Sequence, residues 1–125
     1  MVGIALGDGG PRNLPLSMGM RAGDFIFVSG QVGFGPDGKI IAGGIEAETH
    51  QTLDNIGRAL ALDGAALADV VKVTVWLADL ADFAAFNAVY QTCFPQTRPA
   101  RSTVQAGLLL EARVEIEAIA FAPPT

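Results

Sequence analysis

Residues 98–106 read Arg98-Pro99-Ala100-Arg101-Ser102-Thr103-Val104-Gln105-Ala106, and residues 113–120 read Arg113-Val114-Glu115-Ile116-Glu117-Ala118-Ile119-Ala120. Polar and apolar residues alternate in both runs, and a glycine- and leucine-containing segment separates them. This pattern predicts two strands that pair in antiparallel fashion with one face buried. Because successive side chains point to opposite sides of a strand, we expect Arg101 to share a sheet surface with Glu115 and Glu117.

Arg101 has two interpretations in this arrangement. The first is a structural ion pair with the neighbouring carboxylates, which is the usual state of charged residues on a sheet face. In the second, the planar guanidinium binds the carboxylate of a ligand in two-point geometry, and Glu115 is free to order or deprotonate a water molecule. The residues alone leave both interpretations open.

The rest of the chain predicts a single mixed sheet with two helices. Residues 14–20, 25–29 and 70–77 have the composition of strands. Residues 45–62 carry an apolar stripe at helical spacing, and a second helix follows Asp82, where aromatic residues recur every three or four positions until Pro95. The order of two strands, helix, strand, helix and two strands predicts an α+β fold with both helices on one face of the sheet.

The length of 125 residues fits one domain, which we assign to residues 1–125, with the glycine-rich residues 1–12 as a loose leader. Half of the residues are hydrophobic and only 17% are charged, which is an apolar composition for a small protein. Because large exposed apolar patches are unusual on monomers, we expect part of this excess to lie in a subunit interface.

Charge and residue counts exclude several classes of function. The net charge is −5 and the eight Lys and Arg residues are scattered, so nucleic-acid binding is disfavoured. One Cys and one His provide neither a disulfide framework nor a multi-ligand zinc site within one chain. No apolar run approaches the roughly 20 residues of a membrane span, and no signal segment is visible. We therefore expect no membrane partner and a cytoplasmic location.

Six blocks of sequence occur in an order that a known family shares. They are Phe27-Val28-Ser29-Gly30-Gln31, residues 51–56, residues 70–79, residues 82–90, and Pro99-Ala100-Arg101-Ser102 with residues 114–120. Together they span about residues 14–121 and resemble the Rid family, the reactive intermediate deaminases, also called YjgF or L-PSP endoribonuclease proteins. This resemblance implies a fold similar to the Bacillus-type chorismate mutase arrangement. It also implies a homotrimer with clefts between neighbouring chains.

The resemblance further implies an activity and a set of site residues. Rid proteins hydrolyse 2-imino acids such as 2-iminopropanoate and 2-iminobutanoate to 2-oxo acids and ammonia. By analogy, Arg101 holds the substrate carboxylate and Glu115 places the water molecule. A backbone carbonyl near Thr103 accepts a hydrogen bond from the imine. The residues that bind the substrate or shape the cleft are then Ser29, Gly30, Asn87, Arg101 and Thr103. Because an imine carbon is already electrophilic, the reaction needs no metal or organic cofactor.

Two positions depart from the pattern of many close Rid deaminases. Thr103 replaces a Cys, which is tolerable if only its backbone is used, and Leu16 replaces a Tyr, which removes a hydrogen-bond donor and should change substrate choice or rate. Three alternatives therefore stay open beside the deaminase. The chain could hydrolyse another imine or enamine in a dedicated pathway, bind small carboxylates or act as a chaperone without turnover, or cleave RNA, which its acidic charge disfavours.

Overall fold

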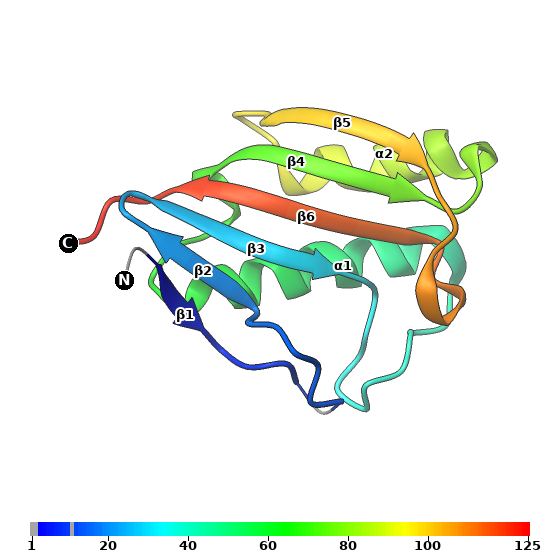
Figure 1. Cartoon of the computed structure of the whole chain (residues 1–125). Coiled ribbons are helices and arrows are strands. Elements are labelled where there is room, and N and C mark those ends of the chain that lie inside the picture. Colours follow the sequence, from blue (N-terminus) through cyan, green and yellow to red (C-terminus); the bar gives the residue numbers. More distant parts are fainter. Residues whose placement is uncertain (1–2, 11) are drawn as a thin grey trace.

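The computed structural model describes residues 3–10 and 12–125, which fold into one sheet with two α-helices (Figure 1). The elements along the chain are β1 (Ile4–Leu6), β2 (Gly19–Ala22), β3 (Phe25–Gln31), α1 (Gly44–Ala61), β4 (Val70–Leu77), α2 (Phe83–Cys93), β5 (Ala100–Gln105) and β6 (Val114–Phe121). Three short 3-10 turns, Leu67–Asp69, Leu80–Asp82 and Leu109–Glu111, connect some of them.

The sheet has six strands in the order β1-β2-β3-β6-β4-β5. β4 and β5 are parallel, and all other neighbours are antiparallel. Both helices lie on the same face, with α1 behind β3 and β6 and α2 behind β4 and β5 in the view of Figure 1. The predicted class, a single mixed sheet with two helices on one face, is confirmed.

The two C-terminal strands, β5 and β6, are not paired with each other, contrary to the prediction. β4 lies between them, in parallel with β5 and antiparallel to β6. A parallel pair needs a long crossover connection, and α2 provides it between β4 and β5. Alternation identifies a segment as a strand, but it does not identify the strand next to it.

Arg101 and Glu115 consequently point to opposite sides of the sheet. Arg101 is aligned with Val73, which is buried beneath the helices. Glu115 is aligned with Trp76, three residues further along β4 and therefore on the other side. The predicted surface shared by Arg101, Glu115 and Glu117 is wrong. β5 is an edge strand without a fully buried residue, so the hydrophobicity of its alternate positions does not reveal which side faces the helices.

The hydrophobic core lies between the helices and the sheet. The apolar stripe predicted for the first helix is buried, and so is the middle of the aromatic repeat in the second. The largest fully buried apolar side chains are Ile26, Leu53, Ile56, Leu60, Val73, Val75, Leu77, Phe86, Val114 and Ile116. Neither helix in the described part of the chain combines the length and apolar character that a membrane crossing requires.

The N-terminal segment is more ordered than the sequence suggests. Ile4–Leu6 forms β1 and pairs with β2, although we expected residues 1–12 to be a loose leader. Residues 1, 2 and 11 lie outside the described residues. The first predicted strand is also shifted, because β2 begins at Gly19 and the preceding residues 14–18 form an irregular segment beside the end of β3.

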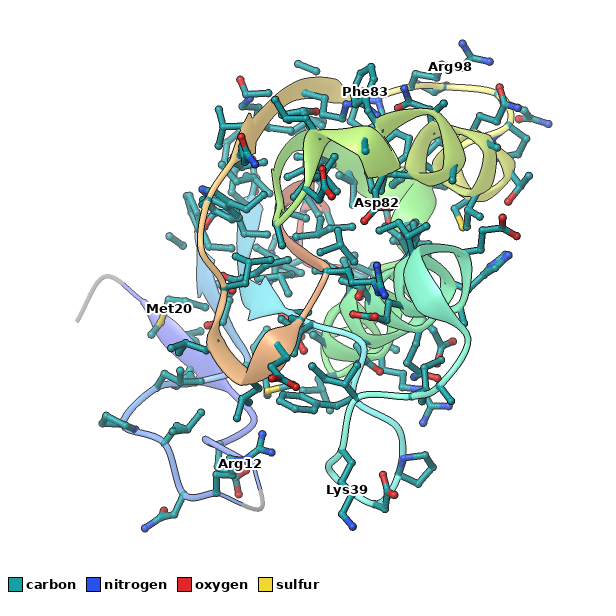
Figure 2. All side chains as sticks on the ribbon, turned by 90° about the vertical axis from the view of Figure 1, so that its right-hand side faces the viewer. Arg12, Met20, Lys39, Asp82, Phe83 and Arg98 are labelled. Atoms are coloured by element: carbon teal, nitrogen blue, oxygen red, sulfur yellow. The ribbon has the colours of Figure 1, made fainter. Side chains whose placement is uncertain are left out.

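The face of the sheet opposite the helices is uncovered and partly apolar. Met20, Phe25, Phe27, Val104 and Phe121 are 38–47% exposed, and the register of the strands places all five on this face. Figure 2 shows Met20 on the side of the sheet away from the helices. An apolar sheet face of this kind favours contact with another protein surface.

Candidate functional site

The guanidinium group of Arg101 lies over three aromatic rings of α2. Its central carbon is 4.7 Å from the ring centroid of Tyr90, 5.4 Å from that of Phe86 and 5.8 Å from that of Phe83. These separations are within the range of cation–π attraction. We call these three side chains the aromatic platform. Helical spacing places the three rings on one face of α2, and the parallel pairing of β5 with β4 places Arg101 over them.

Arg101 forms no ion pair with any residue in the described part of the chain. The ion pairs found there use the guanidinium groups of Arg21, Arg58 and Arg113. An aromatic face attracts the cation without using up its N–H donors, so these donors remain available to an anion. Within one chain, the structural pairing of Arg101 with Glu115 or Glu117 is excluded, because the carboxylates lie on the other side of the sheet.

Two buried hydroxyl groups near Arg101 lack hydrogen-bond partners. They belong to Tyr90 of the aromatic platform and to Thr103, which follows Arg101 on the same side of β5. Burial raises the pKa of Tyr90, and the charge of Arg101 partly opposes this rise. Tyr90 is therefore neutral at physiological pH. Asn87, on the same helix, is half-buried.

Glu115, Ser29 and Gly30 form a second group on the uncovered side of the sheet. The carboxylate of Glu115 occupies the space that a Cβ atom on residue 30 would take, so glycine is required for this close approach. The Ser29 hydroxyl donates a hydrogen bond of 2.6 Å to the carbonyl oxygen of Ser17. This bond ties the end of β3 to the irregular segment of residues 14–18.

The environment of Glu115 favours its protonated form. Partial burial raises the pKa of the Glu115 carboxyl, and the nearby negative charge of Glu117 raises it further. A carboxylate with a raised pKa is a stronger base than an ordinary glutamate, because it holds a transferred proton more tightly. Glu115 is therefore suited to accept a proton from a water molecule.

The predicted site residues thus fall into two groups that one chain does not bring together. Arg101, Thr103 and Asn87 lie on the side of the helices, whereas Ser29, Gly30 and Glu115 lie on or beside the uncovered face. The sequence analysis also missed the aromatic platform. The spacing of its residues indicated a buried helix face, but only the register of β5 places a cation over them.

The described residues offer no evident metal centre. Among residues 3–10 and 12–125, no three His, Cys, Asp or Glu side chains are grouped closely enough to hold a metal ion. The side chains of the two groups offer anion binding by Arg101 and proton transfer by Glu115.

Known proteins are similar to this chain in both sequence and fold. The model of the family described as Endoribonuclease L-PSP matches residues 12–122. The chain is 45% identical over 108 residues to Reactive Intermediate Deaminase A, chloroplastic, from Arabidopsis thaliana, a match that covers 85% of this chain and 58% of that protein. It is 43% identical over 112 residues to 2-iminobutanoate/2-iminopropanoate deaminase from Mus musculus, covering 88% of this chain and 83% of that protein. The crystal structure of yeast Mmf1 is similar with a TM-score of 0.90 at 36% identity, covering 96% of this chain and 98% of that one.

The chain therefore belongs to the Rid family, whose members are also described as YjgF or L-PSP endoribonuclease proteins. Its single mixed sheet with two helices is the fold shared with solved Rid-family structures such as yeast Mmf1. The chain spans 58% of the length of the Arabidopsis relative. The names of the relatives include chloroplastic and mitochondrial proteins, so a cytoplasmic location stays a prediction for this chain.

Proposed function

We propose that this protein hydrolyses 2-imino acids to 2-oxo acids and ammonia. Water adds to the imine carbon, the carbon–nitrogen bond breaks after the nitrogen is protonated, and ammonia leaves. The proposal depends above all on one observation: the guanidinium of Arg101 lies on the aromatic platform with no acidic partner in the described part of the chain. The names of the mouse and Arabidopsis relatives support the same reaction class.

Arg101 would bind the substrate carboxylate. Its planar fork of N–H donors matches a carboxylate in two-point geometry, and such charge-assisted hydrogen bonds are stronger than neutral ones. The aromatic platform keeps the cation away from solvent on one side, which strengthens its attraction for an anion on the other. Binding the carboxylate in this way would hold the imine carbon at a fixed place relative to the attacking water.

Glu115 would orient the attacking water and accept one of its protons. The raised pKa brings its basicity closer to that of an efficient general base at neutral pH. The proton then reaches the departing nitrogen, so Glu115 returns to its ionised state and no cofactor is consumed. Ser29 and Gly30 would shape the wall beside this carboxylate, and Asn87 and the backbone at Thr103 would line the part of the cleft beside Arg101.

The complete site would require two copies of the chain. Arg101 and Glu115 lie on opposite sides of one sheet, so a substrate that contacts both must lie between Arg101 of one copy and Glu115 of another. Such a contact joins two different surfaces, and a repeated heterologous contact forms a ring when the rotation between neighbouring copies closes. A homotrimer with three equivalent clefts satisfies this requirement, and the apolar uncovered face of the sheet offers surface for the contact.

A coupled assay tests the proposal. A threonine dehydratase releases the imine, semicarbazide traps it, and the enzyme competes by hydrolysing it first. We expect the wild-type protein to suppress semicarbazone formation and Arg101→Ala to lose this effect by about a hundredfold or more, because a charge-assisted bidentate contact is removed. Arg58→Ala, which alters an exposed arginine on α1, is the matched control and should behave as wild type. Removal of imine by the wild type no faster than by buffer would disprove the proposed function.

A further inference from the structure

Ser29 and Gly30 lie where the pairing of β3 with β6 is irregular. The register of the two strands shifts between Val28 and Gln31, so a regular ladder does not fix the residues between them. The Glu115 carboxylate nevertheless lies so close to Gly30 that a Cβ atom has no room there. Such a close contact needs other groups that hold the two strand ends in place.

The turn that follows β3 is held by Asn55 of α1. The Asn55 side-chain amide donates hydrogen bonds of 3.0 and 3.1 Å to the carbonyl oxygens of Val32 and Phe34. Its own carbonyl oxygen accepts a hydrogen bond of 2.9 Å from the side chain of Gln51, one turn earlier in the helix. Since Val32 is two residues from Gly30, Asn55 fixes the backbone just beyond the irregular part of β3.

The start of β6 is held by Glu48, which lies earlier on α1. The Glu48 side chain is 6% exposed, and one of its oxygen atoms accepts a hydrogen bond of 2.9 Å from the backbone N–H of Arg113. The other oxygen lies 3.5 Å from the Nε atom of the same arginine, whose guanidinium also lies 3.8 Å from Asp82. Since Arg113 is two residues from Glu115, this buried carboxylate fixes the backbone just before the proposed base.

The two anchors lie on the same side of one helix. Asn55 follows Glu48 by about two turns, so both side chains project from the same face of α1. Figure 1 shows the start of α1 next to the end of β3 and the start of β6. There the backbone of Gly33 packs directly against Glu48, where an added Cβ atom would lie 3.1 Å from the Glu48 Cα and carbonyl oxygen atoms. A single helix therefore holds both strand ends.

From these contacts we infer that Asn55 and Glu48 are positioning residues for the reaction: they hold Gly30 and Glu115 in the relative placement that the attacking water requires. Both residues act through Glu115 and not through contact with the substrate. This inference rests on the proposed function, because it takes Glu115 as the general base. A displacement of a reacting group by about 1 Å can lower a rate about a hundredfold, so anchors two residues away control the base.

Asn55→Ala tests the first anchor. We expect kcat in the coupled imine assay to fall about tenfold or more with KM within about twofold, because Arg101 still binds the substrate carboxylate. Asn55→Asp keeps the size of the side chain, but its carboxylate cannot donate hydrogen bonds, so it should show the same loss and serves if the Ala variant does not fold. Asp54→Ala, at the exposed neighbouring position, is the matched control and should keep the wild-type kcat. An unchanged kcat in Asn55→Ala, or a rise in KM alone, would overturn the inference.

Arg21→Met separates positioning from a general loss of stability. Arg21 is 7% exposed and donates hydrogen bonds of 3.0 and 2.8 Å to the carbonyl oxygens of Gly23 and Ala122, at the opposite end of β3 from Gly30. This variant loses buried polar contacts, as the anchor variants do, and should lower the stability while keeping kcat within about twofold. A loss of kcat as large as that in Asn55→Ala would overturn the inference.

A pair of variants tests the second anchor. Glu48→Gln keeps an oxygen that accepts the hydrogen bond from the Arg113 N–H, and it should retain kcat within about threefold of the wild-type value. Glu48→Leu offers no acceptor and should lower kcat about tenfold or more. Equal losses in the two variants would show that the charge of Glu48, and not the hydrogen bond, is important, and would overturn its assignment as an anchor.

A titration decides the inference even if no imine is hydrolysed. In that case the proposed function fails, and NMR of isotope-labelled glutamate carboxyl groups follows Glu115, whose signal is identified by its absence from Glu115→Gln. Burial raises the pKa of Glu115, and the charge of Glu117 raises it further. We expect Asn55→Ala and Glu48→Leu to lower this pKa by about 0.5 or more, because water reaches a less tightly packed carboxylate, and Arg21→Met to leave it unchanged. An unchanged pKa in either anchor variant would overturn the inference.

Discussion

The guanidinium carbon of Arg101 lies 4.7 Å from the centroid of the Tyr90 ring, with two further rings of α2 within 6 Å. The cation that the proposed function requires is therefore held by π faces rather than by a carboxylate. This arrangement fixes the position of the guanidinium without neutralising its charge. A carboxylate partner would neutralise that charge.

The aromatic platform should affect substrate binding more than the chemical step. We expect Tyr90→Leu to raise KM for a 2-imino acid about three- to tenfold with a smaller change in kcat, because it removes the nearest ring beneath Arg101. Tyr90→Phe keeps the ring and should restore the wild-type KM. Steady-state kinetics of both variants would check this. Equal defects in the Leu and Phe variants would show that the hydroxyl, and not the ring, is important.

Gly30 should be essential because of the space that it leaves for Glu115. Gly30→Ala would place a methyl group where the Glu115 carboxylate lies, so the carboxylate must move. We expect a loss of activity similar to that of Glu115→Gln, measured with the coupled imine assay. Gly107→Ala is the matched control, because a Cβ atom there meets no atom within 4 Å. Full activity in Gly30→Ala would show that the position of Glu115 does not control the reaction.

Subunit mixing tests whether the site lies between two copies. Arg101→Ala and Glu115→Gln should each be inactive alone. After denaturation and joint refolding in equal amounts, random assembly should restore about one quarter of the wild-type sites, since a quarter of the interfaces receive both native residues. Activity of the mixture measured against each variant refolded alone would check this. A mixture as inactive as its components would place both residues in a single chain's site or outside the site.

The raised pKa of Glu115 predicts a dependence of stability on pH. A carboxyl group whose pKa is raised on folding binds its proton more tightly in the folded state, so its contribution to stability is present below its unfolded pKa. The contribution is lost as pH rises through the folded value. Glu115→Gln removes this titration and should be more stable than wild type at pH 7 but not at pH 4.

Urea unfolding of both proteins at the two pH values would measure this difference. A variant less stable than wild type at pH 7 would contradict the prediction. That result would indicate that a cation of a neighbouring copy compensates for the burial of the Glu115 carboxylate.

A buried carboxylate joins α1 to the start of β6. The Glu48 side chain is 6% exposed, and it accepts a hydrogen bond of 2.9 Å from the backbone N–H of Arg113 and lies 3.5 Å from the Nε atom of the same residue. We expect Glu48→Ala to lower the free energy of unfolding by about 2–4 kcal/mol, because these buried groups lose their partner. Glu46→Ala, at an exposed position in the same helix, should change it by less than about 0.5 kcal/mol. Urea titration of both variants would distinguish them.

Part of the fold could be predicted because its signals are local. The apolar stripe of α1 and the aromatic repeat of α2 follow from helical spacing, which needs no knowledge of the partner surface. The strands β3, β4 and β6 were recognisable from their β-branched and alternating residues. The short strand β1 was not, because three residues carry too little pattern and its pairing with β2 depends on the rest of the sheet.

The candidate site was predictable only as a set of residues. The resemblance to the Rid family selected Arg101, Glu115, Ser29, Gly30, Asn87 and Thr103. Their arrangement depended on the insertion of β4 between β5 and β6, and a shift of one residue in register moves every side chain to the opposite face. The predicted proximity of Arg101 and Glu115 was therefore wrong for a single chain.

The sequence by itself determined the family, the two helices, the longer strands and the candidate chemical groups, because these depend on residue identity and on periods within short segments. The tertiary structure decided which strands are neighbours, which face of the sheet Arg101 takes and which side chains hold its guanidinium. Those features depend on contacts between residues far apart in the chain, such as Arg101 with Tyr90 and Gly30 with Glu115. Such contacts follow from the global packing of the core, and no local pattern encodes them.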